Sequence, residues 1–303
     1  MAFPSKTVLI TGARGFTGQR LRTHLQTAGW RVVGLDRAPA SGPDEISADL
    51  ARPEQLRAAL AAVQPDSVIH LAAITFVPHG DPVEMYQTNL FGTLNLLDAI
   101  LTVVPQIRKV LIASSANVYG NPPVEVIDET VCPAPVNHYA MSKLAMEHMA
   151  RTYQDRLPLL ITRPFNYTGP GQASHFLIPK IVDHYRRRQP VIELGNLEVI
   201  RDFSDVRLLV EVYRRLLESN VAGETVNICS GVGTALGEII ARMNQIAGYA
   251  IEVRVNPAFV RANEVRRLIG DNHKLRRLIG ELPDYAMDDI LQSLYSPTQP
   301  PAP

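Results

Sequence analysis

Cysteine, lysine and excess charge are all scarce in this sequence. Cys132 and Cys229 are its only cysteines, which excludes a disulfide framework and offers no closely spaced pair of metal ligands, so we expect no metal site. The 30 Lys and Arg residues balance the 30 Asp and Glu residues. Because a neutral chain has no long-range attraction for nucleic acid or anionic lipid, we expect neither partner and look for a small-molecule ligand.

The sequence also lacks segments that would direct the chain into a membrane or a secretory route. No apolar run approaches the ~18 residues of a membrane span. The N-terminus leads through Lys6 into a strand-like run, without the apolar stretch and cleavage site of a signal peptide. We expect a cytoplasmic protein, and a reducing compartment agrees with the low cysteine content.

Short apolar, β-branched runs alternate with helical patterns through the first half of the chain. The predicted strands are residues 6–11, 31–35, 67–71, 109–113 and 159–162, and the predicted helices are residues 15–28, 53–63, 82–104 and 139–153. Strands that alternate with helices predict an α/β fold in which a Rossmann-type, doubly wound parallel sheet is covered by right-handed crossovers. We assign this dinucleotide-binding domain to residues 1–164.

The second half follows a looser pattern. Helices are predicted near residues 175–188, 206–218, 235–248 and 272–279, and short strands near Val191, Val226 and Val253. We expect residues 165–295 to form mainly a smaller, mixed α/β substrate lobe, from which segments near 200–230 can return to the first domain. The Pro-rich tail, residues 296–303, is expected to be disordered.

A glycine-rich turn follows the first predicted strand and opens the first predicted helix. In the run TGARGFTG, Gly12 permits the tight turn, Gly15 lets the backbone approach a pyrophosphate, and Gly18 lets helix and strand pack closely. An acid, Asp36, ends the next predicted strand. The turn, with Arg14 and Phe16 inside it, therefore predicts a dinucleotide site, and the alternative is a glycine-rich turn that holds no ligand.

Asp36 and its neighbours bear on which dinucleotide binds. The carboxylate is placed to accept hydrogen bonds from the adenosine ribose and to repel a 2′-phosphate, which favours NAD(H). Arg14 and Arg37 flank the same place and could pair with the phosphate of NADP(H). Asp49 and Leu50 precede the next helix and are placed to reach the adenine, although a helix N-cap role for Asp49 or a neighbour is an alternative of nearly equal weight.

Tyr139 and Lys143 are four residues apart and therefore share one face of a predicted helix. A neighbouring ammonium favours the phenolate and lowers the pKa of a tyrosine, which suits it to acid–base chemistry. Ser115 lies where the strand of residues 109–113 ends, at the sheet edge where ligands bind in such folds. Tyr and Lys at this spacing are also common on solvated helix faces, but lysine is rare here, with 5 in the chain.

These motifs resemble the extended short-chain dehydrogenase/reductase family that acts on nucleotide sugars. The resemblance rests on the glycine-rich turn, on His70-Leu71-Ala72-Ala73, on Asn89, on Ser114 to Gly120 and on the YxxxK pair, and it covers nearly the whole chain. It implies that Tyr139 is the catalytic acid–base, that Lys143 holds the nicotinamide ribose, and that Ser115 contacts the reacting sugar oxygen. Leu71, Ala72, Ala73 and Asn89 would complete the cofactor site.

The resemblance extends to the substrate lobe. Asn166, in the run RPFN, would contact the sugar nucleotide, and Arg201 lies in a GNLxxxRD stretch like that of enzymes of GDP-mannose-derived sugars. Arg261 matches a second diphosphate ligand, with Glu264 beside it. Arginine offers a fork for phosphate oxygens, although most of the 25 arginines of this chain are expected to form surface ion pairs.

The type of reaction follows from what is missing beside Ser115. The 4,6-dehydratases of this superfamily carry an acid within two positions of the active-site hydroxyl, where this chain has Ala116 and Asn117. Neither can serve as a general acid or base, so elimination is disfavoured and carbonyl reduction remains. The resemblance then implies NAD(P)H-dependent reduction of a nucleotide-linked 4-keto-6-deoxyhexose at C4, most closely GDP-4-keto-6-deoxy-D-mannose to GDP-D-rhamnose.

Two other functions remain open. A nucleotide-sugar 4-epimerase would use the same Ser, Tyr and Lys with a tightly held NAD, and a non-catalytic dinucleotide-binding module would not need Tyr139 and Lys143. His138 departs from relatives, which usually carry Pro before the catalytic Tyr, and it either alters the approach to the site or merely packs there.

Relatives of the family also pair two helices across a homodimer interface. The corresponding helices here are those near residues 82–104 and 139–155, where Leu90, Leu94, Leu97, Met146 and Met149 exceed the apolar surface that one sheet face obviously needs. We expect a homodimer, with packing inside a single chain as the alternative.

Overall fold

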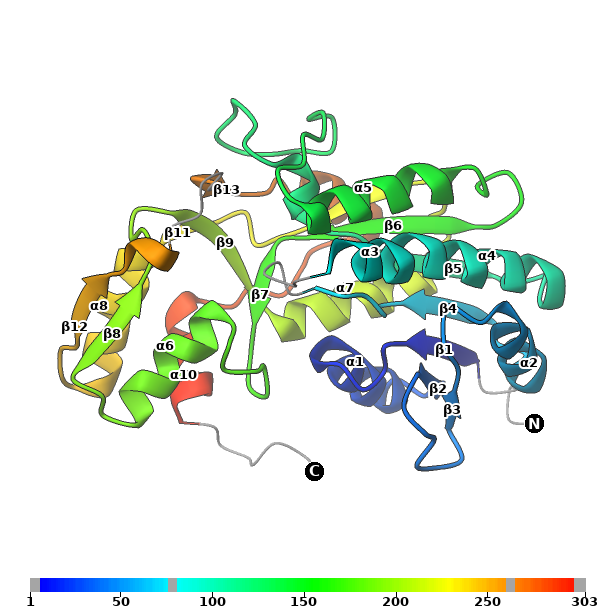
Figure 1. The fold of residues 1–303 in the computed structure, drawn as a ribbon, viewed down its shortest axis with the longest axis horizontal. Coiled ribbons are helices and arrows are strands. Elements are labelled where there is room, and N and C mark those ends of the chain that lie inside the picture. Colours follow the sequence, from blue (N-terminus) through cyan, green and yellow to red (C-terminus); the bar gives the residue numbers. More distant parts are fainter. Residues whose placement is uncertain (1–5, 76–80, 260–264, 297–303) are drawn as a thin grey trace.

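The computed structural model describes residues 6–75, 81–259 and 265–296, which form a large lobe and a smaller one (Figure 1). The large lobe is built on a seven-stranded sheet of order β10-β6-β5-β4-β1-β2-β3, in which every neighbouring pair is parallel. Its strands are β1 (Thr7–Thr11), β2 (Arg31–Asp36), β3 (Glu45–Ser47), β4 (Ser67–His70), β5 (Lys109–Ala113), β6 (Leu159–Pro164) and β10 (Thr225–Ile228).

Helices cover both faces of this sheet, which explains why its strands are apolar on both sides. Side chains alternate along β1, so that Leu9 packs under one helical layer while Val8 and Ile10 pack under the other. The first layer consists of α2 (Pro53–Val63), α4 (Gly92–Val103) and α5 (His138–Arg151). The second consists of α1 (Phe16–Thr27), α7 (Val206–Glu218) and α9 (His273–Ile279). The predicted Rossmann-type fold is confirmed.

Strand order reverses between β1 and β4, because the chain winds outward from this point in both directions. Ligands of open α/β sheets bind in the crevice beyond the carboxyl ends of strands at such a switch point. Thr11 and His70 end the two strands here and are paired in register. The glycine-rich turn follows β1 directly, so the fold itself places that turn at the crevice.

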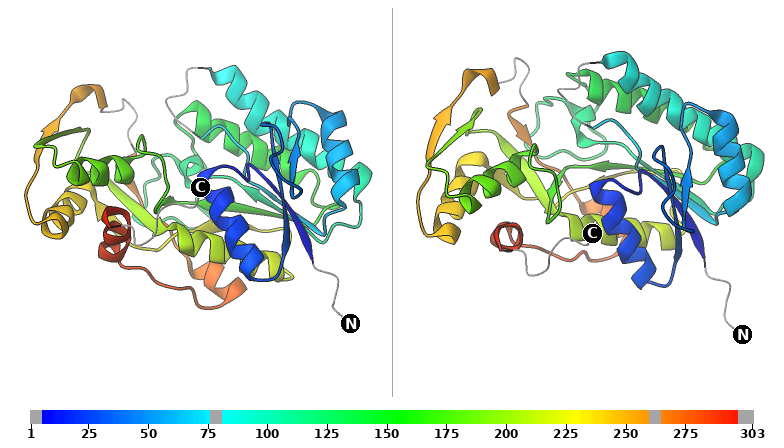
Figure 2. Two further views of the ribbon diagram at one scale, coloured as in Figure 1. Left: turned by 90° about the horizontal axis from the view of Figure 1, so that it is seen from below. Right: turned by 60° about the horizontal axis from the view of Figure 1, so that its bottom comes forward.

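The smaller lobe has its own core (Figure 2). One of its sheets joins β7 (Asn166–Thr168), β9 (Ile200–Asp205), β11 (Gly233–Ala235) and β13 (Arg267–Leu268), and the other pairs β8 (Val191–Leu194) with β12 (Glu252–Val255). Its helices are α6 (Leu177–Arg186), α8 (Leu236–Ala247) and α10 (Met287–Tyr295). A small apolar cluster around Tyr119, Phe165 and Cys229 packs where β6, β10 and the first turns of the smaller lobe meet.

The chain crosses between the lobes more than once. After β9 in the smaller lobe, α7 returns to cover the large sheet, and β10 pairs with β6 at its edge. Residues near 200–230 therefore contribute to both lobes. Leu97 and Met146, which looked surplus to the core from sequence, are fully buried in the first helical layer, so packing within one chain explains them.

The predicted helix of residues 82–104 is continuous but not uniform. It consists of α3 (Pro82–Tyr86), a π-helical turn (Gln87–Phe91) and α4. A π-turn inside a helix often marks a functional site, and Asn89 lies within this one. Two further short helices are the 3₁₀ turns Ala116–Tyr119 and Pro257–Phe259.

Within the described ranges, no helix is both long and apolar enough to cross a membrane. The tail that we expect to be disordered, residues 296–303, lies outside the described residues from residue 297 onward.

Candidate active site

The glycine-rich turn has the geometry of an anion cradle. Gly12 has a φ of +69°, and a Cβ there would lie 2.8 Å from the backbone nitrogen of Ala72. A Cβ on Gly18 would lie 2.3 Å from the carbonyl oxygen of Gly12, so only glycine lets α1 approach the turn this closely. Gly15 is the N-cap of α1 and provides no side-chain cap. The first N–H groups of α1 therefore remain available to a pyrophosphate, and the residues present fit a bound dinucleotide.

The adenosine end of this cradle is defined by Asp36, at the end of β2. Its Oδ2 accepts a hydrogen bond from the backbone N–H of Arg14 at 2.8 Å, which fixes the carboxylate beside the turn. Arg37 is exposed, whereas the Arg14 guanidinium donates to Glu45 at 2.7 Å and to the Pro39 carbonyl at 2.5 Å. The structure thus brings the predicted acid and both predicted arginines together.

Asp49 and Leu50 have structural roles in this region. The Asp49 carboxylate accepts from the Ala51 N–H at 2.9 Å and closes a turn before α2, whose N-cap is Arg52. The N-cap position therefore belongs to a neighbour, Arg52, and not to Asp49 itself. Leu50 is buried in the core and packs against Gly92.

Ser115, Tyr139 and Lys143 meet beneath the carboxyl ends of β5 and β6. Asn137 begins α5 by accepting from the Ala140 N–H at 2.9 Å, so Tyr139 lies in the first turn and Lys143 one turn further. The Ser115 side chain hydrogen-bonds Tyr139. Lys143 donates from Nζ to the Ala113 carbonyl at 2.8 Å. All three side chains are buried, so they form a preorganised group rather than a solvated helix face.

Burial dominates the acid–base properties of this group. It raises the pKa of Tyr139 to about 12, a rise that the hydrogen bond from Ser115 opposes only in part. Lys143 is not among the groups that shift this pKa, so the lowering by Lys143 that the sequence led us to expect is not found. Burial also lowers the pKa of Lys143 to about 8, and the charge of Glu147 acts against that lowering. At neutral pH, Tyr139 is a protonated phenol and Lys143 is an ammonium.

Glu147, one further turn along α5, is a member of the site that sequence reasoning missed. Its carboxylate is fully buried and accepts from Arg163 at 2.9 and 2.6 Å, in a two-pronged ion pair. It also accepts from the hydroxyl of Ser114, the residue before Ser115, at 2.5 Å. The sequence did contain a signal for this residue. Glu147 lies four residues after Lys143, just as Lys143 lies four residues after Tyr139, so all three share one helix face.

A buried chain of hydrogen bonds runs through His70 and connects the switch point to Asn89. The Thr93 hydroxyl donates to the Asn89 carbonyl at 2.8 Å, so it must accept from His70 Nε2 at 2.9 Å. His70 Nδ1 is then the acceptor from Thr11 at 2.7 Å. Burial first, and the charge of Lys143 second, lower the pKa of His70 to about 3. The imidazole is therefore neutral and works as a fixed brace.

The Asn89 side chain braces the loop after β4. Its Oδ1 accepts from the Ile74 N–H at 2.8 Å, and its amide donates to the Ile74 carbonyl and to Ser142, each at 3.0 Å. Both amide hydrogens are used in this way. Asn89 thus acts on the site by holding the segment that contains Leu71, Ala72 and Ala73, rather than as a free ligand of the cofactor.

The smaller lobe contributes Asn166 and Arg201. Asn166 is exposed at the start of β7, and Arg201 is half-buried on β9, where it donates to the Ile200 carbonyl at 2.9 Å. Next to it, the buried Asp202 carboxylate accepts from Ser230, Gly231 and Gly270 and fixes the strand to two loops. The predicted ligands Arg261 and Glu264 lie outside the described residues.

Tyr167 is a second residue that sequence reasoning missed. It lies on β7, donates to or accepts from Thr17 at 2.9 Å, and stacks with Phe16 at a ring-centroid distance of 6.3 Å. Arg20 of α1 also donates to the Pro170 carbonyl. The segment after Asn166 is thereby fixed to the first turn of α1, so both lobes border the same crevice.

His138 contacts α3 beside the site. Its Nδ1 lies 3.3 Å from the Tyr86 hydroxyl, and the two rings meet edge to face. The structure therefore gives His138 a packing contact at the first position of α5. Among residues 6–75, 81–259 and 265–296, no group of three or more His, Cys, Asp or Glu side chains could hold a metal ion.

Known proteins are similar to this chain over nearly its whole length. The family model described as GDP-mannose 4,6 dehydratase matches residues 9–294. A GDP-6-deoxy-D-talose 4-dehydrogenase of Aggregatibacter actinomycetemcomitans is 35% identical over 95% of this chain and 96% of its own. A GDP-6-deoxy-D-mannose reductase of Pseudomonas aeruginosa is 34% identical over 96% of this chain and 97% of its own.

Solved structures share the whole fold. A Burkholderia cenocepacia J2315 protein, described provisionally as an epimerase, has a TM-score of 0.90 at 46% identity and covers 97% of this chain and 98% of its own. The structure of RMD from Pseudomonas aeruginosa with NADPH has a TM-score of 0.83 at 32% identity, with coverage of 97% and 98%.

Proposed function

The chain belongs to the GDP-mannose 4,6 dehydratase family, within the extended short-chain dehydrogenases/reductases that act on nucleotide sugars, and from that premise we propose its reaction. It is an NAD(P)-dependent enzyme. We propose that it reduces the C4 ketone of a nucleotide-linked 4-keto-6-deoxyhexose, most closely GDP-4-keto-6-deoxy-D-mannose to GDP-D-rhamnose. The observation that carries this proposal is the buried group of Ser115, Tyr139 and Lys143 at the carboxyl edge of the sheet.

Each member of the group has one task. A bound nicotinamide supplies the hydride. Tyr139 donates its proton to the C4 oxygen as negative charge develops there, and its raised pKa of about 12 keeps that proton in place at neutral pH. Ser115 donates a hydrogen bond to the same oxygen, and Lys143 places a positive charge nearby. Burial excludes water and strengthens both interactions.

The same residues argue against elimination. Ala116 is buried and Asn117 donates through its backbone and its side chain to the Ser115 oxygen, at 3.2 and 3.1 Å. Neither supplies the acid that a dehydratase uses beside its active-site hydroxyl. A reductase needs only the hydroxyl, the phenol and the ammonium, all of which are present.

The substrate side of the proposal rests on two relatives whose names contain GDP-linked 6-deoxyhexoses. Their products, 6-deoxytalose and rhamnose, which is 6-deoxymannose, differ only at C4. The configuration at C4 of the product therefore depends on which face of the ketone the bound hexose presents to the hydride. Asn166 and Arg201 are the described residues that we propose to contact the sugar nucleotide. We propose the same role for Arg261 and Glu264, which lie outside the described residues.

The second candidate is a nucleotide-sugar 4-epimerase, favoured by the description of the Burkholderia cenocepacia protein. An epimerase recycles its hydride and needs no added cofactor, whereas a reductase consumes NAD(P)H in equal amount to the 4-keto sugar. Incubation with GDP-4-keto-6-deoxymannose and NADH or NADPH, followed by NMR of the product, distinguishes the two. Product formed without net oxidation of NAD(P)H would contradict the proposed reduction.

Replacing Tyr139 tests the assignment of the acid. Tyr139→Phe should lower kcat by at least a hundredfold, because the proton donor is lost, while NAD(P)H binding by calorimetry stays unchanged. Tyr153→Phe is the control, since the Tyr153 hydroxyl bonds Asp98 at 2.8 Å away from the site. Near-normal turnover by Tyr139→Phe would show that another group donates the proton.

We also propose a homodimer through α3, α4 and α5. Their surface, together with the π-helical turn between α3 and α4, carries the exposed apolar side chains of Val83, Phe91, Met141 and Met149. A stable dimer would remove these from water. Phe91→Glu should give a monomer by light scattering, whereas Val232→Glu, at an equally exposed apolar residue in the loop after β10, should not change the mass.

A further inference from the structure

Glu45 holds the arginine that lies nearest to the adenosine end of the cradle. It is the first residue of β3, which pairs with the carboxyl end of β2. Its Oε2 accepts from Arg14 at 2.7 Å and its Oε1 from Arg22 at 3.1 Å. The hydroxyl and the backbone N–H of Ser41 also donate to Oε2, at 2.6 and 2.9 Å. These donors hold the pKa of the carboxyl well below its usual range, so Glu45 stays charged.

The position of Arg14 makes this contact relevant to cofactor choice. The Arg14 backbone N–H is bonded to Asp36, and a small hollow lined by Ala13, Arg14, Gly34, Asp36, Glu45 and Ile46 lies at this point. An acid at the end of the second strand accepts from the ribose hydroxyls of NAD, whereas a nearby arginine accommodates the 2′-phosphate of NADP. The backbone of Arg14 lies beside Asp36, where an arginine could reach a 2′-phosphate, but its guanidinium donates to Glu45 and to the Pro39 carbonyl instead.

We propose that Glu45 is a cofactor-specificity residue: by sequestering the Arg14 guanidinium, it makes the site select NAD(H) over NADP(H). This inference rests on the proposed function, since it concerns the dinucleotide used in that reaction. To bind a 2′-phosphate, Arg14 would have to leave a charge-assisted ion pair. The phosphate would then face the carboxylates of Asp36 and Glu45, and Glu45 would keep only Arg22 and Ser41 as donors. The ribose hydroxyls of NAD(H) require neither change.

The surrounding charges do not alter this reasoning. Asp44 pairs with Arg31 at 3.3 Å on the outer side of the same edge, and Arg22 is held by Glu45 itself. Arg37 is the exposed cation next to Asp36 that has no side-chain partner among the described residues. A single solvated arginine gives a weak, salt-screened attraction, whereas a fork freed from Glu45 could bind the phosphate at two points.

Calorimetric titration of the purified protein with NADH and with NADPH, without any sugar, tests the proposal. The wild-type chain should bind NADH at least tenfold more tightly than NADPH. Glu45→Gln keeps the size and an acceptor oxygen but removes the charge that holds Arg14. It should tighten NADPH binding about tenfold and change NADH binding less than twofold.

Two further variants separate the specific contact from bulk charge. Asp44→Asn removes the same charge from the adjacent residue, which does not touch Arg14, and should leave the ratio of the two affinities within twofold of wild type. Glu45→Gln combined with Arg14→Leu should lose the gain for NADPH. Thermal unfolding of each variant checks that it is folded.

Three results would overturn the inference: a wild-type preference for NADPH, an unchanged ratio in folded Glu45→Gln, or an equal gain in Asp44→Asn. If Glu45→Gln does not fold, the relative affinity of the wild-type chain for NADH and NADPH still tests the inference. Absence of binding by either dinucleotide would instead contradict the proposed function. The two failures are therefore distinguishable.

Discussion

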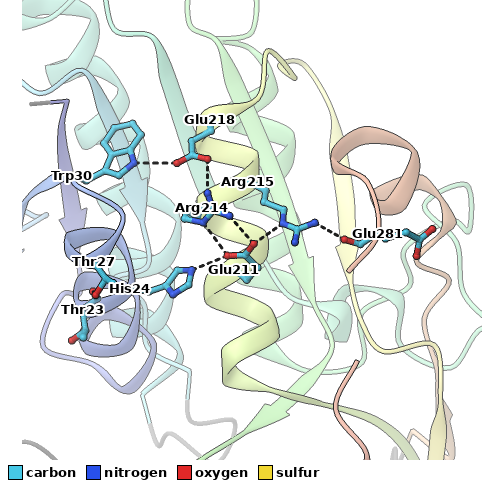
Figure 3. A network of polar contacts seen from close by, with 9 residues as sticks. All are labelled: Thr23, His24, Thr27, Trp30, Glu211, Arg214, Arg215, Glu218 and Glu281. Atoms are coloured by element: carbon cyan, nitrogen blue, oxygen red, sulfur yellow. Dashed lines mark hydrogen bonds and ion pairs between the residues drawn. The ribbon is translucent and has the colours of Figure 1, made fainter. Parts of the chain in front are cut away.

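Two polar clusters in this molecule each combine one glutamate with two arginines, in different surroundings. Beneath the active site, Glu147 accepts from Arg163 and Arg151. Between α1 and α7, Glu211 accepts from Arg214, Arg215 and His24, as Figure 3 shows. The side chains of Glu147 and Arg163 are 0% and 3% exposed, whereas those of Glu211 and Arg214 are 15% and 26% exposed.

This difference decides what each cluster contributes. A buried ion pair has lost its hydration, so removing one partner leaves a charge that nothing compensates. A pair near the surface can exchange its partner for water and loses little. The cluster at Glu147 therefore acts through the precise position of Ser114, Ser115 and Lys143, whereas the cluster at Glu211 joins two helices on the far face of the sheet.

The largest effect is expected from breaking the buried pair. Arg163→Met should reduce the free energy of unfolding by about 3–5 kcal/mol, because the buried Glu147 carboxylate then keeps only the Ser114 hydroxyl and the half-exposed Arg151 at 3.4 Å. Urea unfolding followed by circular dichroism measures this. The double variant Glu147→Met with Arg163→Met should recover most of the loss, since no charge is then left unpaired; a loss of stability below about 1 kcal/mol in the single variant would refute the argument.

The next effect concerns Lys143, whose pKa of about 8 is set by the same buried surroundings. Its ammonium is present below that pH and lost above it, so kcat/KM should fall about tenfold per pH unit above pH 8. Initial rates at several pH values measure this limb, and circular dichroism over the same range checks that the protein stays folded. A rate that is constant to pH 10 would mean that Lys143 does not need its charge.

A smaller effect is expected at the surface cluster. The donors hold the pKa of Glu211 near 2, below its value in the unfolded chain, so its contribution is present above about pH 4.5 and is lost as the pH falls toward 2. Glu211→Gln should cost about 1 kcal/mol at pH 7. High salt should weaken the wild-type contribution here and leave the Arg163→Met effect unchanged, which urea titrations at two salt concentrations would compare.

The smallest effect is expected at His24. His24→Gln should change the free energy of unfolding by no more than about 0.5 kcal/mol, because Glu211 keeps both arginines and the contact is partly solvated. Urea titrations of the wild-type protein and of His24→Gln, measured in parallel, give an upper bound on the change in the free energy of unfolding. A larger loss would mean that the α1–α7 cluster is held as tightly as the buried one.

The sequence predicted the local signals of this site well and the tertiary ones poorly. The glycine-rich turn and the YxxxK pair can each be recognised from a few neighbouring residues. The fold brings Ser115 to Tyr139 because the carboxyl ends of parallel strands lie at one edge of the sheet. The strands β3, β7, β11 and β13 were missed because each has only two or three residues. The six-residue strand β9 was missed as well. Arg163 was noticed for a motif, but its pairing with Glu147 across 16 positions could not be seen without coordinates.

The rarity of lysine proved an imperfect guide. Lys109 is as buried as Lys143, yet it donates to the Leu216 carbonyl and to Ser219 and caps the end of α7. The rarity of lysine therefore does not distinguish Lys143 from Lys109. The helix face shared with Tyr139 is what separates the catalytic candidate from the structural one.

The pairing of β10 with β6 has a consequence for how the protein is made. When a ribosome has released only the first 164 residues, the large sheet still lacks its seventh strand and the helix α7 that covers much of one face. An apolar sheet surface and an open strand edge would then face water or a chaperone until residue 228 emerges. We therefore expect the nascent chain to complete its fold late, and fragments that stop before β10 to aggregate rather than fold.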